Sequence, residues 1–324
     1  MNGLRNGQNP GPEAASTVLV DEEQAGQRID NFLLRVLKGV PKSHVYRMLR
    51  TGEVRVNSRR IDASYRLVAG DRVRVPPVRT AAPAAKPRPR PAALSRHTLY
   101  EDESLLALDK PAGIAVHGGS GISHGIIEQL RQERPELRFL ELVHRLDRET
   151  SGVLLLAKKR SALTALHAQI REGRSFKRYL TLVCGEWREE RRHVKLPLHK
   201  YVTAAGERRV DVEEGGQFAH TLFTRERAFH GYTLLAAELK TGRTHQIRVH
   251  LSHLGYPIAG DDKYGDFALN KLLGRQGLKR MFLHAAEFGF EHPQSSQQVL
   301  LKAPLPDELD GFLRQLPATD QEAA

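Results

Sequence analysis

Asp147 is the acidic side chain whose surroundings in the sequence suggest chemistry most directly. It lies between Arg145 and Arg148, and the continuous apolar run 153–157 follows shortly after. That run predicts a buried strand with the carboxylate at its mouth. Because flanking guanidinium groups favour the ionised carboxylate, Asp147 suits a nucleophile or charge stabiliser better than a general acid. A salt-bridge cluster in a surface loop is the competing interpretation.

A second polar run, 241–250, holds two histidines, His245 and His250, and the basic residue Arg248. It follows an apolar strand pattern, and its glycine predicts a strand-to-helix turn. Ile247 shares a helical face with leucines of the following turns, whereas Arg248 leaves that face and is expected to point towards a site. The two histidines are five residues apart, unlike a His-x-x-x-His zinc pair, so no metal site is predicted.

The run 175–179 ends in Tyr179, directly after the basic pair Lys177 and Arg178. At the start of a strand, an aromatic ring can stack on a nucleic-acid base while nearby cations meet phosphate. A core or edge-strand tyrosine is the competing interpretation. The sequence therefore makes Tyr179 a candidate RNA contact.

Two further polar runs predict no catalytic group. The glycine-rich run 110–121 lacks the spacing of the known phosphate-binding loops, and a surface loop is its plain interpretation. Asp261 and Asp262 are paired carboxylates that suggest metal or acid–base chemistry. As neighbours in a loop, they are expected to face solvent or to cap a turn.

The composition of the chain indicates what kind of molecule the protein binds. The chain has 324 residues, a formal net charge of +12 and a pI of about 9.9, which favours a polyanion such as nucleic acid. No apolar run reaches the roughly 18 residues of a membrane-spanning helix. The first residues lack the apolar segment of a signal peptide. The single cysteine, Cys184, excludes an internal disulfide and is expected to be buried and inert, which fits a cytoplasmic protein.

The sequence predicts an α+β fold in two modules. The first, 18–76, is small and basic. The second, 94–316, alternates strand and helix patterns, which predicts a mixed, mainly antiparallel sheet flanked by helices. The proline-rich segment 77–93 is expected to be an extended linker. The ends, 1–17 and 317–324, are expected to be disordered.

In the first module, helix and hairpin patterns carry many cations. Apolar spacing predicts a helix from Ile29 to Leu37, and Ser43 is expected to cap a second helix that ends at Gly52. Asn57-Ser58 predicts a turn. Since nearly all charges of this stretch are positive, phosphate contacts are favoured over a merely solvated face. The cations singled out for RNA binding are Lys42, Arg47, Arg50 and Arg59.

In the second module, short apolar runs predict strands. Two of these runs flank His230-Gly231, which predicts a tight hairpin. Ser161 is expected to cap a helix over 162–172, with Gly173 as its end. The strand runs are 105–108, 153–157, 179–184, 221–229 and 232–239.

The nonapeptide 144–152, His-Arg-Leu-Asp-Arg-Glu-Thr-Ser-Gly, resembles the catalytic motif of the RluA-type pseudouridine synthases. The runs 110–113, 241–250 and 261–265 resemble further motifs of this family, the first of them as a support for the active-site floor. The basic module resembles the alpha-L RNA-binding domain of a small-subunit ribosomal protein. The resemblance covers almost the whole chain and implies a pseudouridine synthase fold preceded by this RNA-binding domain.

The resemblance also implies roles for individual side chains. Asp147 is implied as the nucleophile, with Arg248 in a salt bridge to it. Tyr179 is implied to stack on the target uracil and is a candidate general base. Ile247 is implied to pack beneath that base, and Arg145 to enter the RNA stack in place of the extruded nucleotide.

The implied reaction is the isomerisation of specific uridines in large-subunit ribosomal RNA to pseudouridine. No cofactor is expected, because the product is an isomer of the reactant, and a monomer is expected. One alternative is the same chemistry at other ribosomal or transfer RNA sites. Another is a non-catalytic RNA-binding protein of ribosome assembly. The trio Asp147, Tyr179 and Arg248 speaks against the second alternative, because a pure binder does not need it.

Overall fold

The chain divides into two compact units, residues 1–90 and 91–324, each with its own apolar core. The expected linker lies almost wholly outside the described residues, as do most of the two ends expected to be disordered. The computed structural model describes residues 15–22, 24–37, 40–78, 93–118, 125–204 and 206–317.

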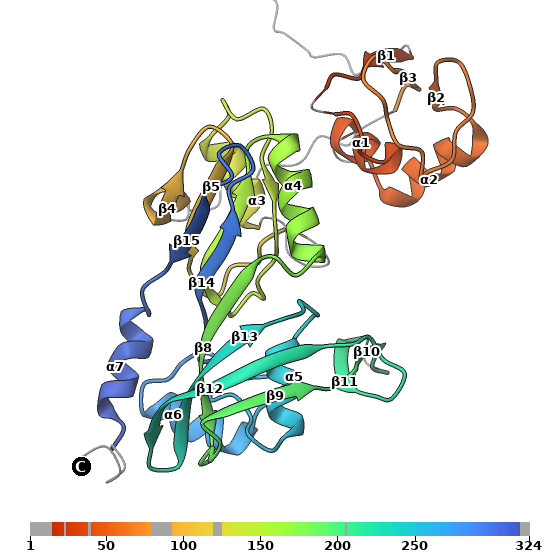
Figure 1. Cartoon of the computed structure of the whole chain (residues 1–324). Helices are drawn as coiled ribbons and strands as arrows, with labels where there is room; N and C mark the ends of the chain where they lie inside the picture. Colours follow the sequence, from red (N-terminus) through yellow and green to blue (C-terminus); the bar gives the residue numbers. More distant parts are fainter. Residues whose placement is uncertain are drawn as a thin grey trace, which may run out of the picture. The chain divides into compact units, whose positions relative to one another are not determined.

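The N-terminal unit packs two helices against a three-stranded antiparallel sheet of order β1-β3-β2 (Figure 1). Phe32 and Leu33 of the first helix and Val45 and Met48 of the second fill its core, which is why their helical spacing was informative. The helices are α1 Ile29–Val36 and α2 Lys42–Thr51, and the strands are β1 Ser16–Leu19, β2 Arg55–Val56 and β3 Arg72–Val75.

Two local expectations for this unit differ from the structure. Ser16 and Thr17, expected in a disordered end, pair with β3 as part of β1, because the open edge of β3 offers them backbone partners. Ser43 does not cap α2. The helix boundary is at Pro41, whose φ of −58° already suits the helical turn that starts at Lys42.

The turn predictions for this unit are confirmed. Gly52 ends α2 in the left-handed conformation with φ of 73°. Asn57 and Ser58 form the predicted turn after β2, also with positive φ values, 48° and 67°. These residues place Arg59 and the end of α2 on the surface of the small unit.

The larger unit is built on a ten-stranded sheet of order β4-β5-β7-β14-β8-β13-β12-β9, with β15 on β14 and β6 on β7. β7 and β14 are parallel and the other pairs are antiparallel, so the predicted mixed, mainly antiparallel sheet is confirmed. β10 Leu198–Val202 and β11 Arg208–Val212 form a separate ribbon. The sheet strands are β4 Thr98–Glu101, β5 Leu105–Lys110, β6 Glu141–Leu142, β7 Ser151–Ala157, β8 Phe176–Cys184, β9 Arg191–Lys195, β12 His220–Phe229, β13 Tyr232–Leu239, β14 Leu283–Glu291 and β15 Gln298–Lys302.

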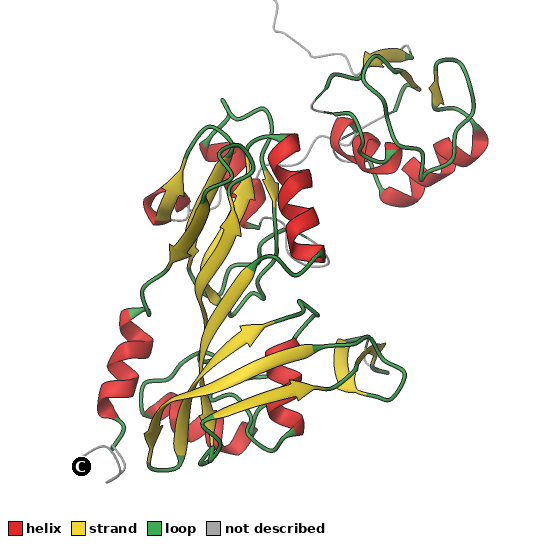
Figure 2. Ribbon diagram, viewed as in Figure 1, coloured by secondary structure: helices red, strands yellow, loops and turns green. Residues whose placement is uncertain are grey.

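Helices flank this sheet (Figure 2). Leu154 of β7 shares a core with Ile127 of α3, and its neighbour Leu155 shares a different core with Leu163 of α4. Since both faces of β7 are buried, its sequence is continuously apolar instead of alternating. Among the described residues, no helix is long and apolar enough to cross a membrane. The helices are η1 Leu94–His97, α3 Ile126–Glu133, α4 Arg160–Arg171, α5 Gln246–His253, α6 Phe267–Arg275 and α7 Asp307–Gln315.

The predicted start of α4 needs correction. Ser161 lies inside the first turn and caps nothing, and the helix begins at Arg160 after an extended Lys159. The end of β7 therefore sets this boundary. The predicted stop at Gly173, with φ of 71°, and the turn at His230-Gly231 are confirmed.

Gly152 allows β7 and β14 to meet closely. Its φ is 107°, and a Cβ atom there would lie 2.2 Å from the carbonyl oxygen of Ala285. Ala285 pairs with Gly152 on one side and with Tyr179 of β8 on the other. The loop that carries Asp147 and the strand that carries Tyr179 thus meet across β14.

Candidate active site

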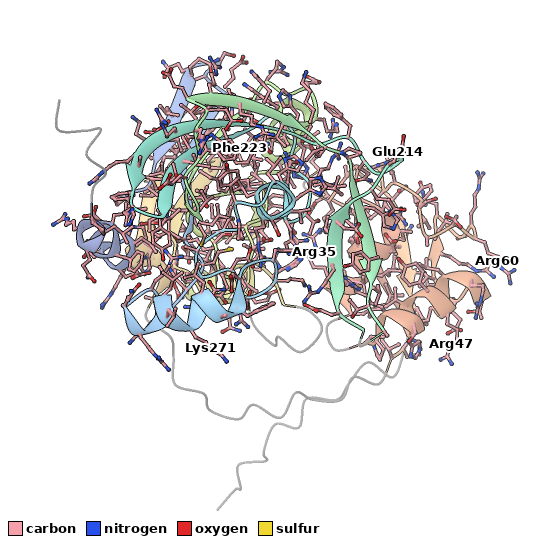
Figure 3. The ribbon with its side chains drawn as sticks, turned by 90° about the horizontal axis from the view of Figure 1, so that it is seen from below. Arg35, Arg47, Arg60, Glu214, Phe223 and Lys271 are labelled. Carbon is pink, nitrogen blue, oxygen red and sulfur yellow. The ribbon has the colours of Figure 1, made fainter. Side chains whose placement is uncertain are left out.

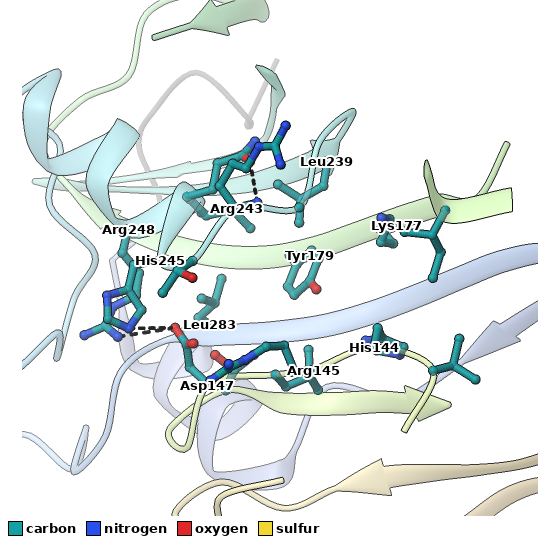
Figure 4. Close-up of a pocket in the computed structure, with 18 residues that line it drawn as sticks. His144, Arg145, Asp147, Lys177, Tyr179, Leu239, Arg243, His245, Arg248 and Leu283 are labelled. Carbon is teal, nitrogen blue, oxygen red and sulfur yellow. Dashed lines mark hydrogen bonds and ion pairs between the residues drawn. The ribbon is translucent and has the colours of Figure 1, made fainter. Parts of the chain in front are cut away.

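A pocket of about 280 Å³ lies where three segments distant in the sequence converge: the loop before β7, the first half of β8 and the turn into α5 (Figure 4). The site residues inferred for the second module all line it. They are Arg145, Asp147, Tyr179, Ile247 and Arg248.

Arg248 lies between the buried Asp261 and Asp147, and its Nη2 is also 3.5 Å from Oδ1 of the exposed Asp262. Its Nε and Nη2 donate to Asp261 at 2.7 and 2.6 Å, and its Nη1 lies 3.4 Å from Oδ2 of Asp147. Burial by itself would lower the pKa of Arg248, but the two aspartates raise it above its usual value, so the guanidinium stays charged. The side chain of Arg248 is 7% exposed, whereas that of Asp147 is 22% exposed and remains accessible from the pocket.

The arginines beside Asp147 in the sequence do not hold it, which corrects the expectation. Arg148 points to solvent and pairs with Glu149 at 2.8 Å. Arg145 is exposed at the pocket and has no ion pair or hydrogen bond within the part of the chain that the structure describes. Successive side chains in an extended segment point in different directions. The cation that reaches Asp147 therefore comes from α5.

Lys110 anchors the loop around Asp147. Its buried Nζ donates to the carbonyl oxygens of Pro111 and Ile114, each at 2.8 Å, and to that of Arg148 at 3.0 Å. Gly113 N–H donates to the same Arg148 oxygen at 2.8 Å. Burial lowers the pKa of Lys110 to about 7. The run 110–113 thus supports the floor of the pocket; residues 119–124 of the glycine-rich stretch lie outside the described part.

Tyr179 and Ile247 provide the apolar walls. Tyr179 is buried with its ring at the pocket, and its hydroxyl has no hydrogen-bond partner among the described residues. Burial, reinforced by Asp147, raises the pKa of Tyr179 well above its usual range. A protonated phenol favours stacking over general-base chemistry. Ile247 is both a core residue and a pocket residue, so its core packing is confirmed, while its packing beneath a base stays a prediction.

Lys177 is an unbalanced cation in the pocket wall. It lies two residues before Tyr179 on the same strand face, is 8% exposed, and has no ion pair within the described ranges. Burial lowers its pKa. The alternate residue Arg178 points away and pairs with Glu226 at 2.7 Å and Glu287 at 3.3 Å. Lys177 is thus the basic residue of this pair that faces the pocket.

Asp261 is a site residue that the sequence did not reveal. The expectation that it faces solvent or caps a turn is half right: its Oδ1 accepts the backbone N–H of Lys263 at 2.8 Å and of Tyr264 at 3.0 Å, but its side chain is only 1% exposed. Burial acts to raise its pKa, but the hydrogen bonds and charge of Arg248 outweigh this and lower it. Asp262, the adjacent carboxylate, is 78% exposed as expected. Adjacent positions in this loop differ because only Asp261 is buried and bonds Arg248 through both of its oxygens, and no local sequence pattern predicts that contact.

His245 is the second such residue. In the sequence, His245 was considered only as a possible zinc ligand together with His250. The structure separates the two: Nδ1 of His250 bonds Thr221 at 3.0 Å in the core, whereas Nε2 of His245 lies 3.7 Å from Asp147 Oδ2. Figure 4 shows His245 and Arg248 together beside Asp147.

The basic residues singled out in the small unit belong to a different part of the sequence from the pocket residues. These four cations are exposed, and none has a carboxylate partner in the described part of the protein. In Figure 3, Arg47 and Arg60 project outward from the small unit. The four are Lys42, Arg47 and Arg50 on α2 and Arg59 after β2.

Comparisons with known proteins agree with this architecture. The RNA pseudouridylate synthase family model matches residues 104–253, and the S4 domain model matches residues 27–73. Ribosomal large subunit pseudouridine synthase C of Pasteurella multocida (strain Pm70) is 52% identical over 305 residues, covering 93% of this chain and 94% of the relative. The protein of that name from Escherichia coli (strain K12) is 52% identical over 305 residues, covering 92% and 96%.

Among solved structures, human RNA pseudouridylate synthase domain containing 4 is 25% identical with a TM-score of 0.58, over 70% of this chain and 96% of that chain. Human RNA pseudouridylate synthase domain containing 1 is 25% identical with a TM-score of 0.56, over 69% and 96%. The chain therefore belongs to the RluA-type family of RNA pseudouridine synthases, isomerases that here carry an S4 RNA-binding domain ahead of the synthase domain.

Proposed function

We propose that this enzyme isomerises specific uridines of large-subunit (23S) ribosomal RNA to pseudouridine, with Asp147 as nucleophile acting on a flipped-out nucleotide. The relatives at 52% identity, named as large-subunit synthases, support the choice of RNA. One observation carries the chemistry: the Asp147 carboxylate lies 3.4 Å from the Arg248 guanidinium and is open to a pocket walled by Tyr179. An accessible carboxylate that is paired with a cation is suited to nucleophilic attack.

The target atom of a paired uridine lies inside a stacked helix, so the nucleotide must first leave the stack, at a cost of a few kcal/mol. Arg145 is the residue proposed to take its place. It is exposed at the mouth of the pocket and engaged with no other described residue. A planar guanidinium stacks on neighbouring bases and bonds phosphates, which offsets part of the cost.

Inside the pocket, the uracil is proposed to lie against the Tyr179 ring with Ile247 beneath it. An aromatic face stacks on a base, and an aliphatic side chain excludes water from the other side. Asp147 then attacks either the ribose or the uracil ring. The base is detached, rotated and rejoined through carbon, so atoms are conserved and no cofactor is needed. Arg248 keeps the carboxylate oriented throughout.

The S4 domain is proposed to hold the ribosomal RNA or its precursor through phosphates. Lys42, Arg47, Arg50 and Arg59 are free to meet them, since no described carboxylate neutralises these side chains. Guanidinium and ammonium groups on such a surface bind phosphate without reading sequence. We further propose that the enzyme works as a monomer in the cytoplasm.

The test is to incubate unmodified large-subunit RNA with the wild type, with Asp147→Asn and with Asp310→Asn, an exposed α7 aspartate as control. Pseudouridines are mapped by carbodiimide adducts and reverse-transcription stops. Stops with the wild type and the control, but not with Asp147→Asn, support the proposal and name the sites. Stops that persist with Asp147→Asn exclude Asp147 as nucleophile.

Absence of stops with the wild type on this RNA rejects the proposed substrate. The assay is then repeated on transfer RNA and on small-subunit RNA. Modification there identifies the same chemistry at other sites. Binding of RNA without modification of any of them identifies a binding protein of ribosome assembly.

A further inference from the structure

The tautomer of His245 is set by its neighbours. Its Nδ1 lies 2.7 Å from the Tyr264 hydroxyl, and that hydroxyl accepts the backbone N–H of Val210 in β11 at 3.0 Å. A phenol has one hydrogen to donate, and Nδ1 is the acceptor bonded to it within the described chain. The hydroxyl therefore donates to Nδ1, and the hydrogen of the neutral imidazole is on Nε2.

Nε2 faces the catalytic carboxylate. It lies 3.7 Å from Oδ2 of Asp147, the same oxygen that Arg248 Nη1 approaches at 3.4 Å. The opposite tautomer would turn a lone pair towards this anion, which is electrostatically unfavourable. Arg248 thus bonds Oδ2, His245 Nε2 lies just beyond hydrogen-bond distance of the same oxygen, and Oδ1 has no bonded partner among the described residues.

The ring is mostly buried and its backbone is constrained. His245 precedes α5 with φ of 54°, a conformation that few side chains adopt without a structural reason. Burial lowers its pKa from 6.5, assisted by Arg248 and Lys263 and opposed by Asp147 and Asp261. The neutral ring required by the hydrogen-bond argument is therefore also the form that its surroundings favour.

We propose that His245 is a positioning residue for Asp147. When RNA is bound, its Nε2–H closes the 3.7 Å gap to Oδ2 and holds that oxygen together with the Arg248 guanidinium, so that Oδ1 is the oxygen that attacks. Tyr264 and Val210 fix the donor, which connects the β10–β11 ribbon to the catalytic carboxylate. This inference rests on the proposed function of Asp147 as nucleophile.

Two substitutions of His245 distinguish loss of the Nε2–H donor from damage to the fold. Glutamine places an amide N–H near the Nε2 position. Asparagine reaches only the Nδ1 position, where it keeps a partner for Tyr264, and it tolerates positive φ well. His253→Gln, on the exposed side of the same helix, is the control. Thermal melting verifies that every variant is folded.

The readouts are the single-turnover rate on RNA labelled with tritium at uridine C5 and the Kd for the same RNA. His245→Asn is expected to slow the reaction by about 10- to 100-fold with unchanged Kd, the scale of one hydrogen bond to a charged group. His245→Gln is expected to keep most of the wild-type rate. Tyr264→Phe is expected to slow the wild type but to add nothing to His245→Asn.

Equal rates for the asparagine and glutamine variants, whether both fast or both slow, would overturn the inference. So would a loss that appears only in Kd. Failure of the proposed function looks different, because then the wild type forms no pseudouridine or Asp147→Asn retains activity.

Discussion

At the scale of single residues, Asp261 determines the orientation in which the Arg248 guanidinium contacts Asp147. The guanidinium gives two of its nitrogens to the buried carboxylate and one to the accessible one. A bidentate pair fixes the plane of the guanidinium, so the direction of the remaining N–H is set before substrate arrives. Such preorganisation avoids rearrangement during the reaction.

We predict that Asp261→Asn lowers both stability and rate. Arg248 then loses its buried counter-charge and keeps only the more exposed Asp147 and Asp262, which costs about 3 kcal/mol of the free energy of unfolding. The reaction should slow while RNA affinity stays the same, because Arg248 loses its orientation. Urea denaturation and single-turnover rates measure the two effects. Asp262→Asn, at an exposed neighbour, should change stability little; equal losses in both variants would contradict the prediction.

The same pair predicts a pH dependence. The pKa of Asp261 is lowered in the folded protein, so its stabilisation is present above the unfolded value of about 3.9 and is lost as pH falls through the folded pKa. The stability difference between the wild type and Asp261→Asn should therefore shrink as pH is lowered from 7 towards 3. Denaturant midpoints at several pH values measure this difference. A difference that is constant over this range would count against it.

Lys177→Met is expected to stabilise the protein and impair the enzyme. A buried cation without a counter-charge costs free energy, so its removal should increase the free energy of unfolding by about 1 kcal/mol or more. The rate or RNA affinity should fall, because the pocket wall loses the positive charge that faces substrate. Thermal melting and the pseudouridine assay report the two effects. The paired neighbour is the control: Arg178→Met should bring no gain in stability, and a lower melting temperature for Lys177→Met would refute the argument.

At the scale of elements, the parallel contact between β7 and β14 brings the Asp147 loop towards β8. It depends on Gly152, whose backbone passes close to Ala285. The apolar sequence of β7 predicts a buried strand, but it does not say which strand lies beside it. Register and neighbour follow from the packing of the whole sheet.

Gly152→Ala should damage both fold and activity. The added Cβ would lie 2.2 Å from a backbone oxygen at a φ of 107°, and combined overlap and backbone strain cost about 3 kcal/mol or more. Gly274→Ala is the matched control, since it lies in α6 with open space around it. That change should stabilise by about 0.5–1 kcal/mol. Thermal unfolding of both variants decides, and a Gly152→Ala protein as stable as wild type would disprove the packing argument.

The starts of helices were predicted less well from the sequence than the strands and turns. Ser43 and Ser161 have the side chains of good N-caps, yet neither caps a helix. In one case Pro41 already sets the backbone angle, and in the other the extended chain leaving β7 runs directly into α4. A capping side chain determines a boundary only where the backbone is free to choose it.

At the scale of the whole molecule, a net charge of +12 has two distinct uses. Many cations are neutralised within the fold, as Arg178 and Arg248 are by carboxylates. Others, including the four on the S4 domain, face solvent without a described counter-charge. Only the second group can release counterions from RNA on binding.

Neutralising Lys42, Arg47, Arg50 and Arg59 together to glutamine should weaken RNA binding and flatten its salt dependence. If each meets one phosphate, the slope of log Kd against log salt should fall by up to about 3. Filter binding at several salt concentrations measures it. A control of equal charge change should leave the slope nearly unaltered, and an unchanged slope in the S4 variant would disprove the assignment. The control residues are Lys271, Arg275, Lys279 and Arg314.

The sequence by itself determined the features that depend on neighbours in the chain. Apolar periodicity and turn residues identified most strands, the first helices and the turn into α5, and the run around Asp147 identified the nucleophile proposed here. These features are local, since hydrophobic period and backbone preference act over a few residues.

Only the tertiary structure decided which groups meet at Asp147. Arg248 is 101 residues away in the chain, and Asp261 and His245 gain their importance solely through that meeting. Strand order and register bring these loops together, and both arise from burying two sheet faces at once. Contacts of this kind leave no period in the sequence, which is why the sequence singled out Asp147 but not Asp261 and His245, which lie around it.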